Sequence, residues 1–314
     1  MSLPIPAFPP GLSPGARLPV INAIAHLATG TSFEVTARDH DAIEQARSTI
    51  PPSSMISITW LPTDTDDDRI AAARALRDGG FVPLPHIASR RIANVFDADT
   101  LLARLADEAG VDRLLLIGGD VSKPAGEFSS SLELLSRTAI TARGYRAIGF
   151  GGYPESHPTV PAEVLEQDLD TKIAVAQDMG LDAFVITQFA FNADSIMAWL
   201  ARFRDRGNEA VVRIGLAGPA TLSTLMRYAR ICGVGTSARA LISNGASFAR
   251  LIREAGPDPV IRTLAEEDVQ HKFGPVALHL FPFGGLDKAA RWMAPVARGR
   301  LTLQRQGAGF EPEL

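Results

Sequence analysis

Eight short apolar runs, separated by longer amphipathic stretches, constrain the fold of this 314-residue chain more than any other feature. The runs lie at residues 32–37, 55–60, 81–87, 113–119, 147–152, 183–190, 212–218 and 277–283. Each run is almost continuously apolar, which is typical of strands covered on both faces in a parallel sheet. Helical patterns with a capping residue before them or a glycine at their end lie at 68–80, 97–110, 163–180 and 221–233. The chain is therefore predicted to be an α/β protein, a (β/α)8 TIM barrel.

Between the seventh and eighth predicted strands the chain is long enough for extra helices, which we expect within residues 237–256 and 263–273. The alternative fold is an open doubly wound sheet, which usually has a glycine-rich turn after its first strand. The segment SFEVTARDHD at 32–41 contains no glycine. The sequence also has no dinucleotide-binding G-x-G-x-x-G, no P-loop and no H-E-x-x-H motif.

The expected organisation is a proline-rich N-terminal arm at 1–25, one catalytic barrel at 26–300 and a C-terminal tail at 301–314. The first residues lack the apolar segment of a signal peptide, and no run of about 18 apolar residues predicts a membrane span. The only cysteine, Cys232, excludes an intrachain disulfide, and a cytoplasmic location is expected. The net charge of −4 is mild and gives no reason to expect a nucleic acid partner. The arm suggests a homo-oligomer.

Polar residues fall near the carboxyl ends of the predicted strands, where barrels of this kind place their chemistry. They are Glu34, Thr59, His86, Asp120, Tyr153, Glu155, His157, Thr187, Gln188 and His279, and Gly118 and Gly119 precede Asp120. A carboxylate within a strand is costly to bury without a partner, so a functional role is favoured for Glu34. Asp120 has a functional role or caps a loop, and His86 is a ligand contact or a structural histidine. Tyr153 and His157 are site residues or turn residues.

Taken together, these positions favour a bound organic cofactor that the protein orients. The pattern offers one embedded acid, several amides and hydroxyls, and glycines that permit close approach of a planar ligand. The histidines lack the close spacing of a metal-binding motif, so no metal is predicted.

Five motifs resemble those of methylenetetrahydrofolate reductases. They are SFE at 32–34, PHI at 85–87, GGD at 118–120, GYPESHP at 152–158 and ITQFAF at 186–191, and the resemblance runs in order from about residue 31 to 292. It implies a flavin-dependent (β/α)8 barrel with FAD as cofactor and NADH or NADPH as a hydride donor. The implied reaction interconverts 5,10-methylenetetrahydrofolate and 5-methyltetrahydrofolate.

The resemblance also implies roles for individual residues. Glu34 corresponds to the general acid that protonates the folate nitrogen N10, and Asp120 to an anion near the flavin and the pterin. The implied cofactor contacts are Thr59, His86, Gly118, Gly119, Asp120, Tyr153, His157, Asp168 and Lys172. The implied substrate contacts are Gln188, Phe191, Thr224, Tyr228 and Lys288.

Some positions depart from the family pattern. VTARD follows SFE in place of two aromatics and two prolines, and Gly118 stands where the family has arginine. Thr224 and Tyr228 replace a glutamine and a phenylalanine, and Gly285 takes the place of an arginine for the folate tail. We therefore expect a divergent member of this family. A further hypothesis is that the enzyme works in the oxidative direction, in one-carbon recycling. The alternatives are a folate-binding barrel methyltransferase, a flavin-independent reductase of the same family, and a non-catalytic folate-binding subunit.

Overall fold

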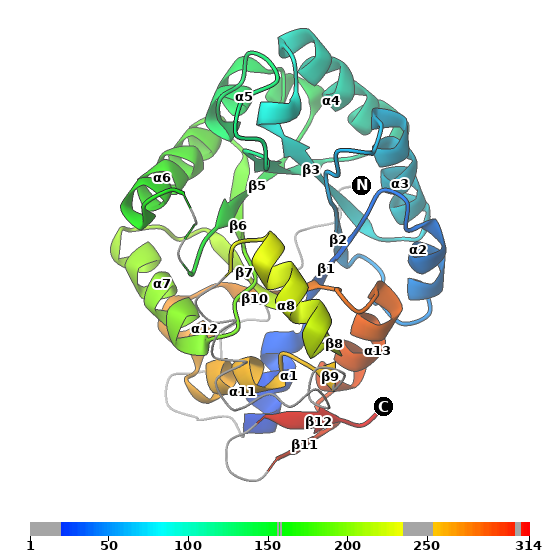
Figure 1. Ribbon diagram of the computed structural model, residues 1–314, viewed down its shortest axis with the longest axis vertical. Helices are drawn as coiled ribbons and strands as arrows, with labels where there is room; N and C mark the ends of the chain where they lie inside the picture. The colour runs from blue at the N-terminus through cyan, green and yellow to red at the C-terminus, as the bar shows by residue number, and fades with distance from the viewer. Residues whose placement is uncertain (1–19, 156, 158, 235–253, 305–308) are drawn as a thin grey trace. The chain divides into compact units, whose positions relative to one another are not determined.

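Eight strands form a closed barrel in a computed structural model that describes residues 20–155, 157, 159–234, 254–304 and 309–314. Around the barrel the order is β1, β10, β7, β6, β5, β4, β3 and β2 (Figure 1). Their bounds are β1 Ser32–Val35, β2 Met55–Ile58, β3 Val82–Ala88, β4 Arg113–Ile117, β5 Ala147–Gly152, β6 Asp182–Thr187, β7 Val211–Ala217 and β10 Val276–Phe281. All eight apolar runs contain strands, and the predicted (β/α)8 TIM barrel is confirmed.

The chain divides into two compact units. The β1–β6 unit consists of residues 32–152 and 160–187, and the β7–β10 unit consists of the described parts of 1–31, 153–159 and 188–314. The predicted domain bounds stay a prediction.

Five helices belong to the β1–β6 unit. They are α2 His40–Ala46, α3 Asp66–Asp78, α4 Val95–Ala109, α5 Ser131–Arg137 and α6 Ala162–Asp178, with short 3-10 turns η1 Ser89–Arg91 and η2 Thr141–Arg143. The start of α3 is fixed by a capping box, in which Thr65 Oγ1 accepts from the Asp68 backbone and Asp68 accepts from that of Thr65. Helix α3 packs on β2 and β3 and lies between α2 and α4 (Figure 1).

A glycine inside β5 shows how tightly the core of this unit is packed. A Cβ atom at Gly149 would lie 2.6 Å from the Phe184 ring and 2.9 Å from Leu115 Cδ1. Phe184 stands opposite Gly149 in the register of β5 and β6. This glycine of the GFGG run is therefore required by close packing of the core.

Six helices with described bounds belong to the β7–β10 unit. They are α1 Val20–Ala28, α7 Ala193–Asp205, α8 Leu222–Ile231, α11 Asp258–Glu266, α12 Val269–Phe273 and α13 Leu286–Val296. The predicted helix at 263–273 is confirmed in part, because α11 and α12 cover most of it. Of the predicted helix at 237–256, residues 237–253 lie outside the described residues. Residues 254–255 form strand β9 (Glu254–Ala255), antiparallel to β8 (Ala220–Thr221), so the helix prediction is wrong there.

The two ends of the chain also differ from expectation. The predicted arm is wrong over residues 20–25, because α1 begins at Val20 and buries an apolar face that includes Ile24 and Leu27. Residues 1–19 of the arm lie outside the described residues. The predicted tail contains strands β11 (Leu301–Leu303) and β12 (Phe310–Pro312), which pair antiparallel, and β12 lies beside α11 (Figure 1).

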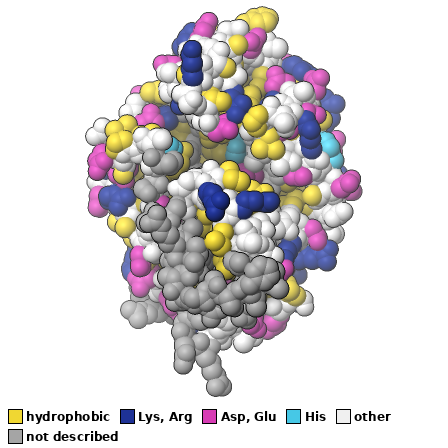
Figure 2. Space-filling model, viewed as in Figure 1, with side chains coloured by type: hydrophobic (Ala, Val, Ile, Leu, Met, Phe, Trp, Pro, Cys, Tyr) yellow, Lys and Arg dark blue, Asp and Glu magenta, His cyan; other side chains and the backbone are white. Residues whose placement is uncertain are grey.

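Charged side chains of both signs are interspersed on the face shown in Figure 2, in agreement with the mild net charge. Among the helices whose residues are described, none combines the length and apolar character needed to cross a membrane.

Candidate active site

An acid, a hydroxyl and an imidazole meet on β1, β2 and β3. Glu34 stands opposite Ser57 in the parallel register of β1 and β2. Ser57 Oγ donates to Glu34 Oε2 at 3.3 Å, and His86 Nε2 lies 3.4 Å from the same oxygen. We call Glu34, Ser57, Thr59 and His86 the acid group.

Burial controls the protonation of the acid group. The side chains of Glu34 and His86 are 13% and 11% exposed. Burial raises the pKa of Glu34 to about 8, against the smaller opposing effect of the Ser57 hydrogen bond. Burial also lowers the pKa of His86 to about 4. At neutral pH the carboxyl therefore keeps its proton and the imidazole is neutral, so this pair is a proton donor beside a neutral ring.

Two polar atoms of the acid group are buried without a hydrogen bond to the residues that the structure describes. Thr59 Oγ1 and His86 Nε2 are buried and form no hydrogen bond within the described part of the chain. Ile58 stands opposite Pro85 in the register of β2 and β3, so Thr59 and His86 follow at the same level. Buried polar atoms without a partner are uncommon, and a polar ligand would satisfy both.

The loop after β4 carries the predicted Gly118, Gly119 and Asp120. Gly119 has a φ of +94°, which favours glycine. The Asp120 side chain is 70% exposed, and its Oδ1 lies 2.7 Å from Arg91 Nη2. Asp120 thus pairs with Arg91 of the 3-10 turn after β3. The sequence does not predict this pair, because no local spacing links positions 91 and 120.

The two predicted cofactor contacts on α6 lie next to each other. Asp168 and Lys172 are four residues apart and form an ion pair and hydrogen bond. Lys172 is the less exposed of the two side chains, at 15%. Their predicted contact with the cofactor stays a prediction.

A pocket in the β7–β10 unit brings together three more predicted residues, Tyr153, His157 and Gln188. The described residues that line it are Tyr153, Glu155, His157, Gln188, Phe189, Cys232 and Val234. Sequence reasoning missed Cys232 and Val234 as pocket residues, since they follow a helix rather than a barrel strand. The one sequence feature that could have indicated them is the apolar end of the predicted helix at 221–233.

The polar groups of this pocket have defined hydrogen-bonding roles. The Thr159 backbone N–H donates to His157 Nδ1 at 3.2 Å, which places the proton of the neutral ring on Nε2. Burial lowers the pKa of His157, so the neutral form prevails at neutral pH. Gln188 Oε1 accepts from the Phe189 backbone N–H at 3.0 Å, which leaves the Gln188 amide NH2 to donate. The Gln188 amide is therefore a hydrogen-bond donor of the pocket.

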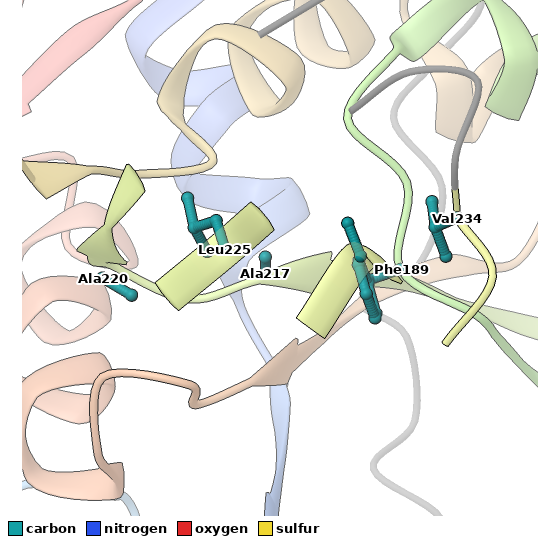
Figure 3. Packing of buried hydrophobic residues seen from close by; sticks show 6 residues of the cluster. Phe189, Ala217, Ala220, Leu225 and Val234 are labelled. Atoms are coloured by element: carbon teal, nitrogen blue, oxygen red, sulfur yellow. The ribbon is translucent and has the colours of Figure 1, made fainter. Parts of the chain in front are cut away.

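An aromatic cluster supports the pocket. Phe189 is 1% exposed, and its ring lies 5.0 to 5.6 Å from those of Phe191, Phe281 and Phe283. Tyr228 stacks on Phe283 with ring centroids 4.1 Å apart. Figure 3 shows the apolar residues around Phe189, which include Ala217 at the end of β7, Leu225 of α8 and Val234. The predicted substrate residues Phe191 and Tyr228 thus each pack against a phenylalanine ring of this cluster.

The remaining predicted substrate residues are engaged within the same unit. Thr224 Oγ1 lies 2.9 Å from Thr221 Oγ1, whose side chain caps the start of α8. Lys288 forms an ion pair with Glu254 of β9. Their contacts with substrate stay predictions. The described residues include no group of three or more metal-ligating side chains.

Comparison with known proteins identifies the family. The family model described as methylenetetrahydrofolate reductase matches residues 40–242, which is more than half of the chain. The chain therefore belongs to the methylenetetrahydrofolate reductase family.

Two individual proteins show the extent of the similarity. Methylenetetrahydrofolate reductase 2 of Saccharomyces cerevisiae is 27% identical over 132 residues, covering 40% of this chain and 22% of that protein. The match thus spans about a fifth of the length of this curated relative. Among solved structures, 3-dehydroquinate dehydratase of Aquifex aeolicus aligns with a TM-score of 0.38 at 9% identity, covering 59% of this chain and 78% of that one.

Proposed function

We propose that this chain is a flavin-dependent oxidoreductase that interconverts 5,10-methylenetetrahydrofolate and 5-methyltetrahydrofolate. The observation that carries the proposal is Glu34, a buried carboxyl whose pKa of about 8 keeps it protonated at neutral pH. Membership of the methylenetetrahydrofolate reductase family supports the same chemistry.

Glu34 is the proposed general acid. In the reductive direction its O–H bond breaks and an N–H bond forms at folate N10 as the C–N bond of the methylene bridge opens. A pKa near the working pH suits an acid that must release and regain a proton in each cycle. In the oxidative direction the Glu34 carboxylate takes the proton back.

FAD is the proposed cofactor, and when bound it would carry the hydride. The acid group fits such a ligand because Thr59 Oγ1 and His86 Nε2 are buried polar atoms without a hydrogen bond to any described residue. Tyr153 and His157, which both line the pocket of the β7–β10 unit, are further proposed flavin contacts. Asp120, Asp168 and Lys172 stay proposed cofactor contacts, and NADH or NADPH is the proposed donor.

Gln188 is the proposed anchor of the pterin ring. Its amide NH2 is available to donate because its oxygen accepts from the Phe189 backbone. The surrounding aromatic cluster gives Gln188 a rigid, apolar support. We further propose that the protein is a cytoplasmic homo-oligomer without nucleic acid partners. Because several positions depart from the family pattern, we also propose that it preferentially turns over 5-methyltetrahydrofolate.

The test is the visible spectrum of the purified protein, before and after anaerobic addition of NADH, NADPH or 5-methyltetrahydrofolate. We expect flavin absorbance that is bleached by a nicotinamide or by the methylfolate. Bleaching by 5-methyltetrahydrofolate supports the oxidative direction. A protein that binds no FAD but still reduces methylenetetrahydrofolate would be a flavin-independent reductase. A colourless protein without this activity in the presence of FAD contradicts the proposal and favours a methyltransferase or a binding subunit.

A further inference from the structure

A buried hydroxyl on the neighbouring strand faces Glu34. Ser57 is 0% exposed, and the register of β1 and β2 places it directly opposite Glu34. Ser57 Oγ lies 3.3 Å from Glu34 Oε2 and 3.4 Å from the Phe33 carbonyl oxygen. A serine hydroxyl has one hydrogen, so it donates fully to one of these two oxygens at a time.

The charge of Glu34 decides which oxygen receives this hydrogen. While the carboxyl is protonated, both acceptors are neutral and compete, in agreement with the two similar and rather long distances. Hydrogen bonds to an ionised carboxylate are shorter and about twice as strong as those between neutral groups. Loss of the Glu34 proton therefore makes Oε2 the stronger acceptor.

We propose that Ser57 is a positioning residue for Glu34, whose hydroxyl turns from the Phe33 carbonyl to Oε2 as the acid releases its proton to the substrate. This inference rests on the proposed function of Glu34 as general acid. No bond of Ser57 breaks, because the transferred proton comes from Glu34 and goes to the substrate nitrogen. The hydroxyl favours the carboxylate over the protonated acid, so it assists proton release without touching the substrate.

His86 acts differently, although its Nε2 lies 3.4 Å from the same oxygen. Within the described residues that nitrogen makes no hydrogen bond, and burial keeps the ring neutral. Of these two neighbours, Ser57 is therefore the one that donates a hydrogen bond to Glu34 Oε2 in this structure.

The direct test follows the Glu34 carboxyl by infrared or carbon NMR titration of the substrate-free protein, labelled with ¹³C-glutamate. Glu34 is assigned as the signal that Glu34→Gln removes, and its midpoint is expected near the pKa of about 8. We expect Ser57→Ala to raise this midpoint by about one to two pH units, because a hydrogen bond to a charged group is lost. The space of one hydroxyl is too small for a replacing water. An unchanged or lowered midpoint overturns the inference.

Two further variants separate this role from general packing. Ser57→Thr keeps the hydroxyl and should restore the wild-type midpoint. Ser89→Ala is the matched control, since Ser89 is also 0% exposed and donates to the Ile117 carbonyl at 3.2 Å. A shift in Ser89→Ala equal to that in Ser57→Ala would overturn the inference.

Kinetics distinguish failure of this inference from failure of the proposed function. In Ser57→Ala we expect the basic limb of the kcat profile for reduction of 5,10-methylenetetrahydrofolate to move up by the same one to two pH units, with KM for this substrate unchanged. If Glu34→Gln abolishes turnover but the Ser57→Ala limb stays in place, the positioning role fails and the function stands. If Glu34→Gln retains turnover, the proposed acid and with it the catalytic role of Ser57 are both wrong.

Discussion

The acid group of the β1–β6 unit and the pocket of the β7–β10 unit are built in different ways. Glu34, Ser57 and His86 lie on buried strands, and strand register brings their side chains together. The pocket joins residues 153–157, 188–189 and 232–234, which come from segments that follow strands or a helix. Regular strand geometry fixes the buried carboxyl, whereas aromatic packing supports the pocket. The two regions should therefore respond differently to substitution.

Replacing the acid should have the largest effect on catalysis and little effect on ligand binding. We expect Glu34→Gln to lower kcat by about 10²- to 10⁴-fold, the usual contribution of a general acid. Flavin content should stay the same, because the amide is isosteric with the carboxyl. Steady-state assays measure the loss. Glu44→Gln is the control, since Glu44 is 71% exposed on α2, and an equal loss there would contradict the assignment.

Replacing the central phenylalanine of the pocket should act on stability instead. We expect Phe189→Ala to lower the free energy of unfolding by about 3–5 kcal/mol, because it removes a ring that packs against three others. Urea denaturation measures this change. Phe96 is 77% exposed on α4, so Phe96→Ala should change the free energy by less than about 0.5 kcal/mol. A similar loss in both variants would show that the cluster does not support the pocket.

The pH dependence of stability should report the acid group. The folded-state pKa of Glu34 is raised from 4.5 to about 8, so its stabilising contribution is complete below pH 4.5 and is lost as the pH rises toward 8. Relative to Glu34→Gln, the wild type should lose about 1.4 kcal/mol of unfolding free energy per pH unit within this window. Urea denaturation of both proteins from pH 5 to 9 tests this. A difference independent of pH would mean that Glu34 is ionised in the folded protein.

The exposed ion pair of the β4 loop should matter least for stability. We expect Arg91→Ala to lower the free energy of unfolding by about 0.2–1 kcal/mol, because Asp120 is 70% exposed and surface pairs are weak. Arg91→Lys should recover part of this by keeping the charge. If urea denaturation shows that Arg91→Ala lowers the free energy of unfolding by more than about 2 kcal/mol, the pair contributes more than a surface ion pair does and this prediction is wrong.

The sequence predicts the barrel well because its eight strands are short, continuous apolar runs with a helix or helical segment after most of them. It also singles out Glu34 and His86, since a polar residue inside a buried strand is conspicuous. How close the side chains of Glu34 and His86 come to each other depends on the register of β1, β2 and β3. The order of apolar and polar residues along one strand does not specify this register. The Arg91–Asp120 pair and the Cys232 side of the pocket depend on loop conformation, which leaves no periodic signal. Helix α1 was missed because the prolines before it extend the predicted arm too far.

The most direct test of the central claim separates the two half-reactions of Glu34→Gln under anaerobic conditions. Flavin reduction by the nicotinamide needs no acid at N10, so its rate should equal that of the wild type. In the proposed mechanism, reoxidation of the reduced flavin by 5,10-methylenetetrahydrofolate uses the proton of Glu34, so stopped-flow absorbance should show it slowed by about 10²-fold or more. Reoxidation at the wild-type rate would contradict the account, because Glu34 would then not be the acid.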